Sequence, residues 1–465
     1  MIPLAFADWI RRLNDAAWGP AMLVLLTGTG AYLTLRTGFL PWRNLPYGFR
    51  CLLRRPEGGT GDVSPFSALM TTLAATIGTG NIVGVATALT AGGPGALVWM
   101  ELSALLGVSS KFAECMLAVK YRTVNRRGEM AGGPMYVMAR ALRPRRLGRA
   151  LAWLFALFTV LASFGVGNMT QSHSMADALW DVFGLAPEKT GAVTAALVVL
   201  VILGGIRSIS RVSSVVVPVM AALYMAAGLA VLVCRWGALP EAVAEMFRLA
   251  FSPAAAAGGV TGSTVSCLLR SARYGIARGC FSNEAGMGSS AVSAAAAITD
   301  HPVRQGYIHM TGVVLDTTVI CTLTGLVICC SGALGHTGAD GAALTILCFR
   351  SVLGESGAVL VAVSIALFAF ATLLGWEYIG EKAAEYLLGS AACPVYRAVF
   401  AAVVYLGAAQ QLELVWGLSD VCNALMALPN LLCLLLLSGE AARDARAFQP
   451  TVDAERRRAG ILTKR

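Results

Sequence analysis

Apolar segments long enough to cross a lipid bilayer recur along the whole chain and constrain its fold more than any other feature. A transmembrane helix needs about 20 predominantly apolar residues to span the hydrocarbon core. About eleven segments meet this length, near residues 17–35, 66–90, 96–118, 150–180, 190–206, 212–234, 255–299 (interrupted), 306–334, 354–387, 394–410 and 413–437. The sequence therefore predicts an all-α polytopic membrane protein, because a helix satisfies its own backbone hydrogen bonds inside hydrocarbon.

The composition supports this class and excludes others. The 465 residues have a mean hydropathy of +0.68, with 57% hydrophobic and 13% charged residues, unlike any soluble globular domain. A net charge of +10 is typical of a membrane protein with basic cytoplasmic loops, so we expect no nucleic-acid partner. The 12 cysteines show no metal-ligand spacing, and we predict no disulfide framework, no metal cluster and no organic cofactor.

Positive charge gathers in alternate loops and predicts the orientation. Arginine and lysine cluster at residues 36–55, 120–149, 207–211 and 443–465, which all fall on one side of an eleven-span zigzag. By the positive-inside rule this side is the cytoplasm, so the N-terminus is expected outside and the C-terminus inside. Arg11 and Arg12 are on the other side in this topology, accompanied by Asp8 and Asp15. These four charges precede the first apolar run, so we expect no cleavable signal peptide.

The stretch from Ser64 to Glu101 contains a span that breaks halfway. Its middle, Ala75–Asn81 (ATIGTGN), consists of small residues, hydroxyls and one carboxamide. Glycine weakens a helix, and Thr and Asn compete for backbone hydrogen bonds. In hydrocarbon an opened backbone is tolerated only where it is buried in protein or lines a cavity. The pattern predicts either a transporter-type binding site at mid-membrane or a small-residue face for close helix packing.

The predicted topology indicates an internal repeat. When the first span is set aside, ten remain, and the broken second span and interrupted seventh span run in opposite directions. Two five-helix halves that each open with a discontinuous helix describe an inverted repeat. We predict three regions: an N-terminal peripheral helix and cytoplasmic loop (1–63), a transporter core (64–437, with repeats at about 64–234 and 255–437) and a cytoplasmic tail (438–465).

The seventh segment holds the densest group of charged and polar residues. Arg270, Arg273 and Arg278 precede Glu284, and charged groups at membrane depth usually face a cavity or a partner. We expect an internal ion pair between Glu284 and Arg273 or Arg278 rather than a direct ligand contact. Asn283 and the neighbouring glycines are better candidates for lining a site, because exposed carbonyls can coordinate a cation and half-helix N-termini can face a carboxylate.

The fourth segment combines an aromatic ring with two carboxamides. In SFGVGNMTQ, a spacing of i, i+4, i+7 places Phe164, Asn168 and Gln171 on one helical face. Such a face suits a small zwitterion, whose amine needs acceptors and whose carboxylate needs donors. Hydrogen bonding between helices explains the same residues equally well.

The ninth segment places a hydroxyl and a large ring one turn apart. Thr372 can join backbone oxygens of the second span in a Na⁺ shell, and Trp376 can close a substrate pocket. The alternative for Thr372 is a hydrogen bond to its own i−4 carbonyl. Asp316 and Asp420 are further acids inside predicted spans, and we expect them to pair with arginines of the seventh segment.

Long ordered runs of residues identify a family. They are TLAATIGTGNIVGVATALTAGGPGALVWM, KFAECMLAVKYR, AGGPMYVM, SFGVGNMTQS, GIARGCFSNEAGMGSSAV, LDTTVICT, TLLGWEYIGEKAAEYLLG and ALPNLL. From about Ser64 to Leu437 the chain resembles the alanine or glycine:cation symporters. This resemblance implies a leucine-transporter-like fold of the amino acid–polyamine–organocation superfamily, with one peripheral helix before a ten-helix core.

The resemblance also implies where the ligands bind. The substrate-binding residues would lie on the broken helices and the spans facing them: Thr76, Gly80, Asn81, Phe164, Asn168, Gln171, Asn283 and Trp376. Na⁺ would bind near Ala75, Gly78 and Thr372. Glu101 and Glu377 depart from the family pattern, which bears on the cation and the details of the substrate but not on the class.

The predicted function is secondary active transport, the Na⁺-coupled symport of alanine or glycine into a bacterial or archaeal cell across its plasma membrane. An H⁺-coupled symporter and a passive facilitator are alternatives on the same scaffold. The sequence shows no nucleophile–base set and no metal-ligand cluster, so we do not expect an enzyme. The expected partners are the amino acid and membrane lipid, with no obligate protein partner.

Overall fold

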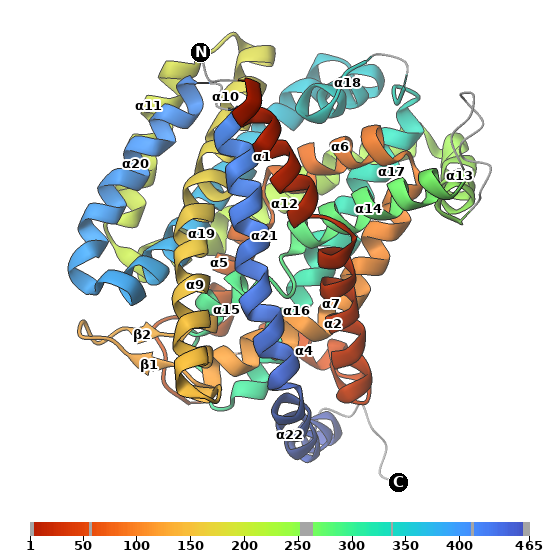
Figure 1. Cartoon of the computed structure of the whole chain (residues 1–465). Coiled ribbons are helices and arrows are strands. Elements are labelled where there is room, and N and C mark those ends of the chain that lie inside the picture. Colours follow the sequence, from red (N-terminus) through yellow and green to blue (C-terminus); the bar gives the residue numbers. More distant parts are fainter. Residues whose placement is uncertain (1–3, 55–57, 252–263, 336–337, 411–412, 459–465) are drawn as a thin grey trace.

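The computed structural model describes residues 4–54, 58–251, 264–335, 338–410 and 413–458, and these residues are mostly helical (Figure 1). The helices of the first half are α1 (Leu4–Ala17), α2 (Pro20–Arg36), α3 (Leu40–Arg43), α4 (Leu45–Leu52), α5 (Pro65–Thr76), α6 (Val83–Gly92), α7 (Gly95–Lys120), α8 (Pro134–Ala141), α9 (Arg145–Phe164), α10 (Thr170–Phe183), α11 (Pro187–Ile202) and α12 (Gly205–Cys234). The strands β1 (Thr123–Val124) and β2 (Met130–Ala131) form an antiparallel hairpin in which Thr123 pairs with Ala131.

The second half continues the same pattern. Its helices are α13 (Leu239–Phe251), α14 (Thr264–Asn283), α15 (Ser289–Ala294), α16 (Pro302–Val313), α17 (Thr322–Ser331), α18 (Gly341–Leu353), α19 (Glu355–Leu388), α20 (Cys393–Ala409), α21 (Glu413–Leu436) and α22 (Ser438–Arg458). Short 3-10 helices occur at Thr79–Asn81, Trp236–Ala238 and Ser390–Ala392, and π-helical segments at Gly165–Met169 and Val314–Cys321.

Most of the predicted spans are present as apolar helices. Within the described ranges, eight helices are long and apolar enough to cross a membrane, and the bent pair Pro65–Thr76 and Thr79–Gly92 makes a ninth. The predicted span at 190–206 corresponds to α11, which has only 16 residues. The predicted interrupted span at 255–299 corresponds to α14 and α15, and its first residues, 255–263, lie outside the described chain.

The arginine-rich loops gather at one end of the molecule. Figure 1 shows α4, the β1–β2 hairpin and α22 at this end, with α1 toward the opposite end. The C-terminal helix α22 is held there by ion pairs, Lys120 with Glu440 at 2.7 Å and Arg304 with Glu455 at 2.8 Å. The hydrogen bond from the Arg304 guanidinium lowers the pKa of Glu455. This clustering is the arrangement that the positive-inside prediction requires.

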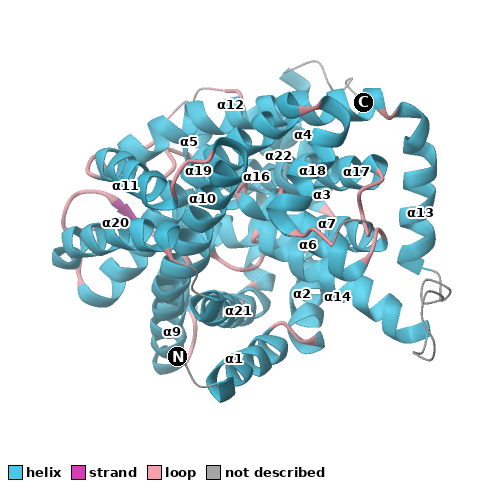
Figure 2. Ribbon diagram, turned by 90° about the horizontal axis from the view of Figure 1, so that it is seen from above, coloured by secondary structure: helices cyan, strands magenta, loops and turns pink. Residues whose placement is uncertain are grey.

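Helix α5 lies inside the bundle and is covered on all sides. Its residues from Ala68 to Thr76 are all buried, as expected for a helix without a polar face. It packs against α12, α15 and α19. Viewed from above, α13 lies at one rim of the molecule and α11 and α20 lie at the opposite rim (Figure 2).

A glycine allows α5 and α19 to approach closely. A Cβ atom on Gly375 of α19 would lie 2.5 Å from the backbone nitrogen of Ala75 on α5. A backbone atom cannot rotate away as a side chain can, so the two helices would have to separate. Gly375 therefore fixes the position of α5 just before it ends at Thr76.

We expect Gly375→Ala to destabilise the purified protein by about 1–3 kcal/mol, the usual cost of overpacking a filled core. Gly28→Ala in α2 is the matched control, because a Cβ there meets no atom within 4 Å. Thermal unfolding in detergent, followed by intrinsic fluorescence, measures both. An unchanged midpoint for Gly375→Ala would contradict the close approach.

Candidate functional site

The second predicted span breaks where its sequence indicates. Ser64 caps the start of α5, whose backbone ladder ends with the bond from Ile77 N–H to Leu73 C=O at 2.7 Å. The chain then turns through a 3-10 segment, and the axis of the second half of the span is bent by 62° from that of the first. This confirms the predicted break between Ala75 and Asn81.

Two side chains take over hydrogen bonds that the break releases, one from another helix and one from the break itself. The N–H of Thr79 would bond to the C=O of Ala75 in a continuous helix, but it donates to Gln171 Oε1 at 3.2 Å. The N–H of Gly78 donates to Asn81 Oδ1 at 3.0 Å. The carbonyl of Ala75 is thereby left without its helical donor, beside the break.

Asn81 and Asp316 brace the break from inside. Asn81 is fully buried, and its Nδ2 donates to Asp316 Oδ1 at 2.9 Å. Asp316 Oδ2 accepts hydrogen bonds from Ser282 at 2.8 Å and Thr317 at 2.9 Å. The expected pairing of Asp316 with an arginine is therefore wrong, because three neutral donors occupy its carboxylate. Since Ser282 belongs to α14, Asp316 connects the two broken helices.

The second break lies between α14 and α15, where the sequence places it. Glu284, Gly286 and Gly288 all have positive φ angles, of 51°, 84° and 90°. The two glycines adopt this conformation without steric cost, whereas at Glu284 the surrounding structure must enforce it. Asn283, at the end of α14, donates to Thr317 Oγ1 at 3.1 Å and accepts from the N–H of Ala285 at 3.0 Å.

A buried carboxylate that the sequence reasoning missed holds the second break. Glu114 Oε2, on α7, accepts the N–H groups of Gly286 and Gly288, both at 3.1 Å, and Asn430 Nδ2 at 3.1 Å. Lys111 lies 3.8 Å from the other oxygen and donates to Ser290. The sequence does contain an indication of this role. Lys111 and Glu114 are charged residues three positions apart inside the apolar third span, and charged groups at membrane depth usually face a partner or a cavity.

A π-helical segment divides the residues that were expected to share one face. Gly165–Met169 interrupts the α-helix, and its wider turn changes the direction of side chains beyond it. Asn168 Nδ2 donates to the carbonyl of Phe400 on α20 at 2.9 Å, and the Phe164 ring packs on Phe400 with centroids 6.0 Å apart. Gln171 instead faces the first break. The predicted common face is therefore wrong.

The glycines of this segment allow two side chains to approach its backbone. A Cβ on Gly167 would collide with the Trp376 side chain, and one on Gly165 with Ser419. Ser419 Oγ accepts the N–H of Val166 at 2.6 Å, and the carbonyl of Val166 accepts Gln171 Nε2 at 3.0 Å. The amide of Gln171 is thus fixed at both ends, between the π-helical segment and the broken span.

The breaks and the facing spans enclose one small cavity, which we call the inner pocket. Its volume is about 10 Å³, close to the space needed for a single water. Its described lining is Ala75, Thr76, Gly78, Gly80, Val166, Gln171, Phe281, Glu284, Thr372 and Trp376. Residues of both breaks, Gly78 and Gly80 of the first and Glu284 of the second, therefore line the same cavity.

The inner pocket includes most but not all of the predicted site residues. Thr76, Gly80, Gln171 and Trp376 line it, as do the three residues predicted to be near Na⁺: Ala75, Gly78 and Thr372. Asn81 and Asn283 instead brace the two breaks, while Phe164 and Asn168 face α20. Thr372 Oγ1 also makes the local hydrogen bond to Phe368 C=O at 3.0 Å.

Glu284 is the one ionisable side chain among the described residues that line the inner pocket. Its carboxylate accepts a hydrogen bond from Ser289, and the expected ion pair with Arg273 or Arg278 is not formed. Arg273 pairs with Asp15 at 2.7 Å, and the Arg278 guanidinium lies 5.4 Å from the centre of the Phe281 ring. A carboxyl group therefore faces the inner pocket, and no arginine is among the described residues that line it.

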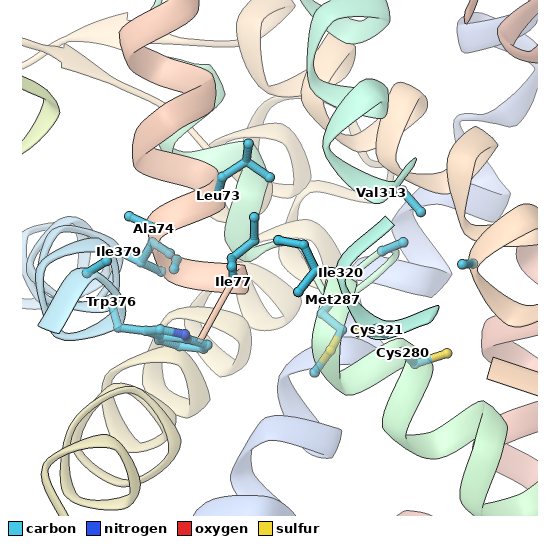
Figure 3. Close-up of a cluster of buried hydrophobic side chains, with 14 of the residues drawn as sticks. Leu73, Ala74, Ile77, Cys280, Met287, Val313, Ile320, Cys321, Trp376 and Ile379 are labelled. Carbon is cyan, nitrogen blue, oxygen red and sulfur yellow. The ribbon is translucent and has the colours of Figure 1, made fainter. Parts of the chain in front are cut away.

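Apolar side chains support the broken helix around this polar centre. In Figure 3, Ile77 lies between two groups of a single buried cluster, with Trp376 and Ile379 on one side and Met287, Ile320 and Cys321 on the other. Trp376 is only 1% exposed. The break is thus buried within the same apolar cluster as the surrounding helices.

Comparison with known proteins gives a consistent result. The sodium:alanine symporter family matches residues 4–460. The chain is 46% identical over 448 residues to "Sodium/alanine symporter AgcS" of Methanococcus maripaludis, covering 95% of this chain and 97% of that protein. It is 37% identical over 430 residues to "Probable sodium/glutamine symporter GlnT" of Bacillus subtilis, covering 91% and 87%.

Among solved structures, the chain is similar to that of MhsT in complex with L-phenylalanine, with a TM-score of 0.57 and 13% identity over 84% of this chain and 99% of that one. This likeness shows the fold, which is the leucine-transporter type that the sequence predicted. The relatives and the structural neighbours are transporters and not enzymes. With polar groups from two broken helices meeting in one buried pocket, the chain belongs to the sodium:alanine symporter family, whose members carry amino acids together with a cation.

Proposed function

We propose that this protein imports alanine or glycine together with Na⁺ across a bacterial or archaeal plasma membrane, with its N-terminus outside and its C-terminus in the cytoplasm. The observation that carries the proposal is the inner pocket, where the released backbone groups of the first break face Glu284, Gln171, Thr372 and Trp376. Relatives named for sodium and alanine support the choice of ligands. The clustering of basic loops at one end supports the orientation.

The residues around the inner pocket suit the two ends of an amino acid. Glu284 offers a carboxyl group to the ammonium group, and the N–H of Gly80 and the second N–H of Gln171 Nε2 offer donors to the carboxylate. Trp376 covers the remaining side, so a substrate side chain that enters there has to be small. Asn81, Asn283, Phe164 and Asn168, which were predicted to touch the substrate, act on it through the geometry of the helices they hold.

Oxygen atoms at the first break suit Na⁺, a hard cation that prefers oxygen ligands. The carbonyl of Ala75 has lost its helical donor to Gln171, and Thr372 Oγ1 lies against Gly78. The hydroxyl of Thr372 uses its proton on Phe368 C=O, which directs its lone pairs elsewhere. A cation bound here would hold the break in the shape that the amino acid requires, which couples the two ligands.

In proteoliposomes we expect labelled alanine to accumulate above its external concentration when Na⁺ is higher outside. Replacing Na⁺ with choline should abolish the accumulation, and glycine should compete more strongly than leucine because Trp376 limits the size of the side chain. Accumulation driven equally well by a proton gradient without Na⁺ would establish H⁺ coupling instead. Equilibration without accumulation would establish a passive facilitator.

We expect Glu284→Gln to raise the alanine concentration for half-maximal uptake by about tenfold or more, because the ammonium group loses a charged partner. Glu101→Gln is the matched control, since Glu101 lies in a neighbouring span, bonds to Thr322 at 2.8 Å and does not line the inner pocket. Initial uptake rates over a range of alanine concentrations measure both. Equal half-saturation values for wild type and Glu284→Gln would remove Glu284 from the substrate site.

We expect Thr372→Val to raise the Na⁺ concentration for half-maximal uptake by about tenfold, because valine has nearly the same shape but no oxygen. Thr372→Ser keeps the oxygen and should retain most of the Na⁺ affinity. Measuring uptake against Na⁺ at saturating alanine separates the effect from substrate binding. If Thr372→Val and Thr372→Ser have the same Na⁺ dependence, the hydroxyl is not a ligand.

A further inference from the structure

The start of α9 carries a patch of positive charge that faces outward. Four exposed arginines form it, and we call them the α9 patch: Arg143, Arg145, Arg146 and Arg149. Within the described residues, none of the four forms an ion pair. Their own stretch of sequence offers no counter-charge, because no acidic residue lies between Glu129 and Asp177. The α9 patch is therefore available to an anionic partner outside the chain.

Large apolar side chains follow directly on the exposed side of the same helix. Trp153 is 53% exposed, and Leu147, Leu154 and Leu161 are 46%, 38% and 46% exposed. The three leucines recur every seven residues, so they form a stripe along α9. The opposite side of α9 packs on α8, α19 and α21. Since α9 begins a segment apolar enough to cross a membrane, this exposed stripe marks its lipid-facing side.

The spacing along α9 places charge and indole at successive depths of the membrane surface. Arg145, Arg149 and Trp153 follow one another at intervals of four residues, so they share one face of the helix. With a rise of 1.5 Å per residue, Trp153 lies about 6 Å deeper along the axis than Arg149. Tryptophan rings are enriched at the level of the lipid headgroups. The arginines are therefore at the level of the phosphate groups.

The basic residues of α22 lie in a different setting at the same end of the molecule. Figure 1 shows α22 and the start of α9 at this end, and α22 finishes with three arginines, Arg456–Arg458. Its large apolar residues are buried, with Phe448 at 6% and Val452 at 0%. Positive charge is thus common to both helices, whereas α9 also has exposed apolar surface beside the charge.

From this arrangement we propose that the α9 patch and its leucine stripe form a binding site for an anionic phospholipid. The guanidinium groups donate to the phosphate oxygens, which an arginine can hold with two parallel hydrogen bonds. The Trp153 ring lies beside the glycerol backbone, and an acyl chain lies along the leucine stripe. A soluble anion would use the arginines alone, so the adjoining stripe favours a lipid. The site does not depend on which solute the protein carries.

A lipid at this site would hold the helix that leads to the inner pocket. α9 continues directly into the π-helical segment Gly165–Met169, and the carbonyl of Val166 in this segment accepts the hydrogen bond from Gln171. A ligand that binds only the folded state also stabilises that state. The anionic lipid should therefore raise the temperature at which the protein unfolds.

The test is lipid binding by the full-length protein in detergent, measured by native mass spectrometry. The two probes are dioleoyl phosphatidylglycerol and dioleoyl phosphatidylcholine, which share their acyl chains and differ in headgroup charge. The wild type should bind phosphatidylglycerol about tenfold more tightly. The triple variant Arg145→Gln, Arg146→Gln, Arg149→Gln should lose this preference. The same three positions changed to lysine should keep part of it, because lysine retains the charge without the planar fork.

The matched control is the triple variant Arg443→Gln, Arg457→Gln, Arg458→Gln. It removes the same charge from exposed positions of α22 and should keep the preference for phosphatidylglycerol. Thermal unfolding gives a second readout: added phosphatidylglycerol should raise the midpoint of the wild type and of this control by several degrees, but not that of the glutamine variant of α9. Equal midpoints without added lipid show that all three proteins are folded.

Equal affinity of the wild type for the two lipids, or an equal loss of preference in both glutamine variants, would overturn the site. Displacement of phosphatidylglycerol by excess glycerol 3-phosphate would also overturn it, because the arginines would then bind a soluble anion without the stripe. Na⁺-driven uptake of alanine in phosphatidylcholine vesicles tests the proposed function separately, since these vesicles contain no anionic lipid.

Discussion

The hydrogen-bond demand of the peptide backbone inside hydrocarbon is the constraint on which the rest of this structure depends. Each N–H or C=O left unpaired in a membrane core costs several kcal/mol, so a helix cannot simply end there. Both broken helices meet this demand with buried side chains, most of them from other spans. Gln171 and Asn81 serve the first break, and Glu114 serves the second. The side chains that hold the two breaks therefore set the shape of the inner pocket, and of the three only Gln171 is in its described lining.

The sequence predicted the parts of the fold that depend on local composition. Hydropathy placed most spans, and the small and polar residues of ATIGTGN placed the first break within Ala75–Asn81. The ordered runs shared with a known family implied the fold and pointed to Thr76, Gly80, Gln171 and Trp376, which do line the inner pocket. The predictions of the spans and of the first break are confirmed, because each depends on residues close together in the chain.

The errors have a common physical origin, which is competition between partners distant in sequence. Nothing local shows that Gly165–Met169 forms a π-helical segment, since this depends on Trp376 and Ser419 pressing against its glycines. The pairing of Glu284 with an arginine was plausible by distance along the helix. Arg273 instead forms an ion pair with Asp15 of the N-terminal helix, and the Arg278 guanidinium lies over the Phe281 ring. Glu114 was overlooked because its partners lie in two other spans.

Asp316 connects the hydrogen bonds of the two breaks. It accepts a hydrogen bond from Asn81 at the first break and from Ser282 at the end of α14, so one carboxylate is shared by both discontinuous helices. A movement of the first break that displaces Asp316 would also pull on Ser282, at the end of α14 that carries Phe281 and is followed by Glu284. Under the proposed function, a cation that orders the first break would thereby act on Phe281 and Glu284, which line the inner pocket. Coupling between the proposed ion and amino-acid sites would then require no long-range signal, because a single buried side chain contacts both broken helices.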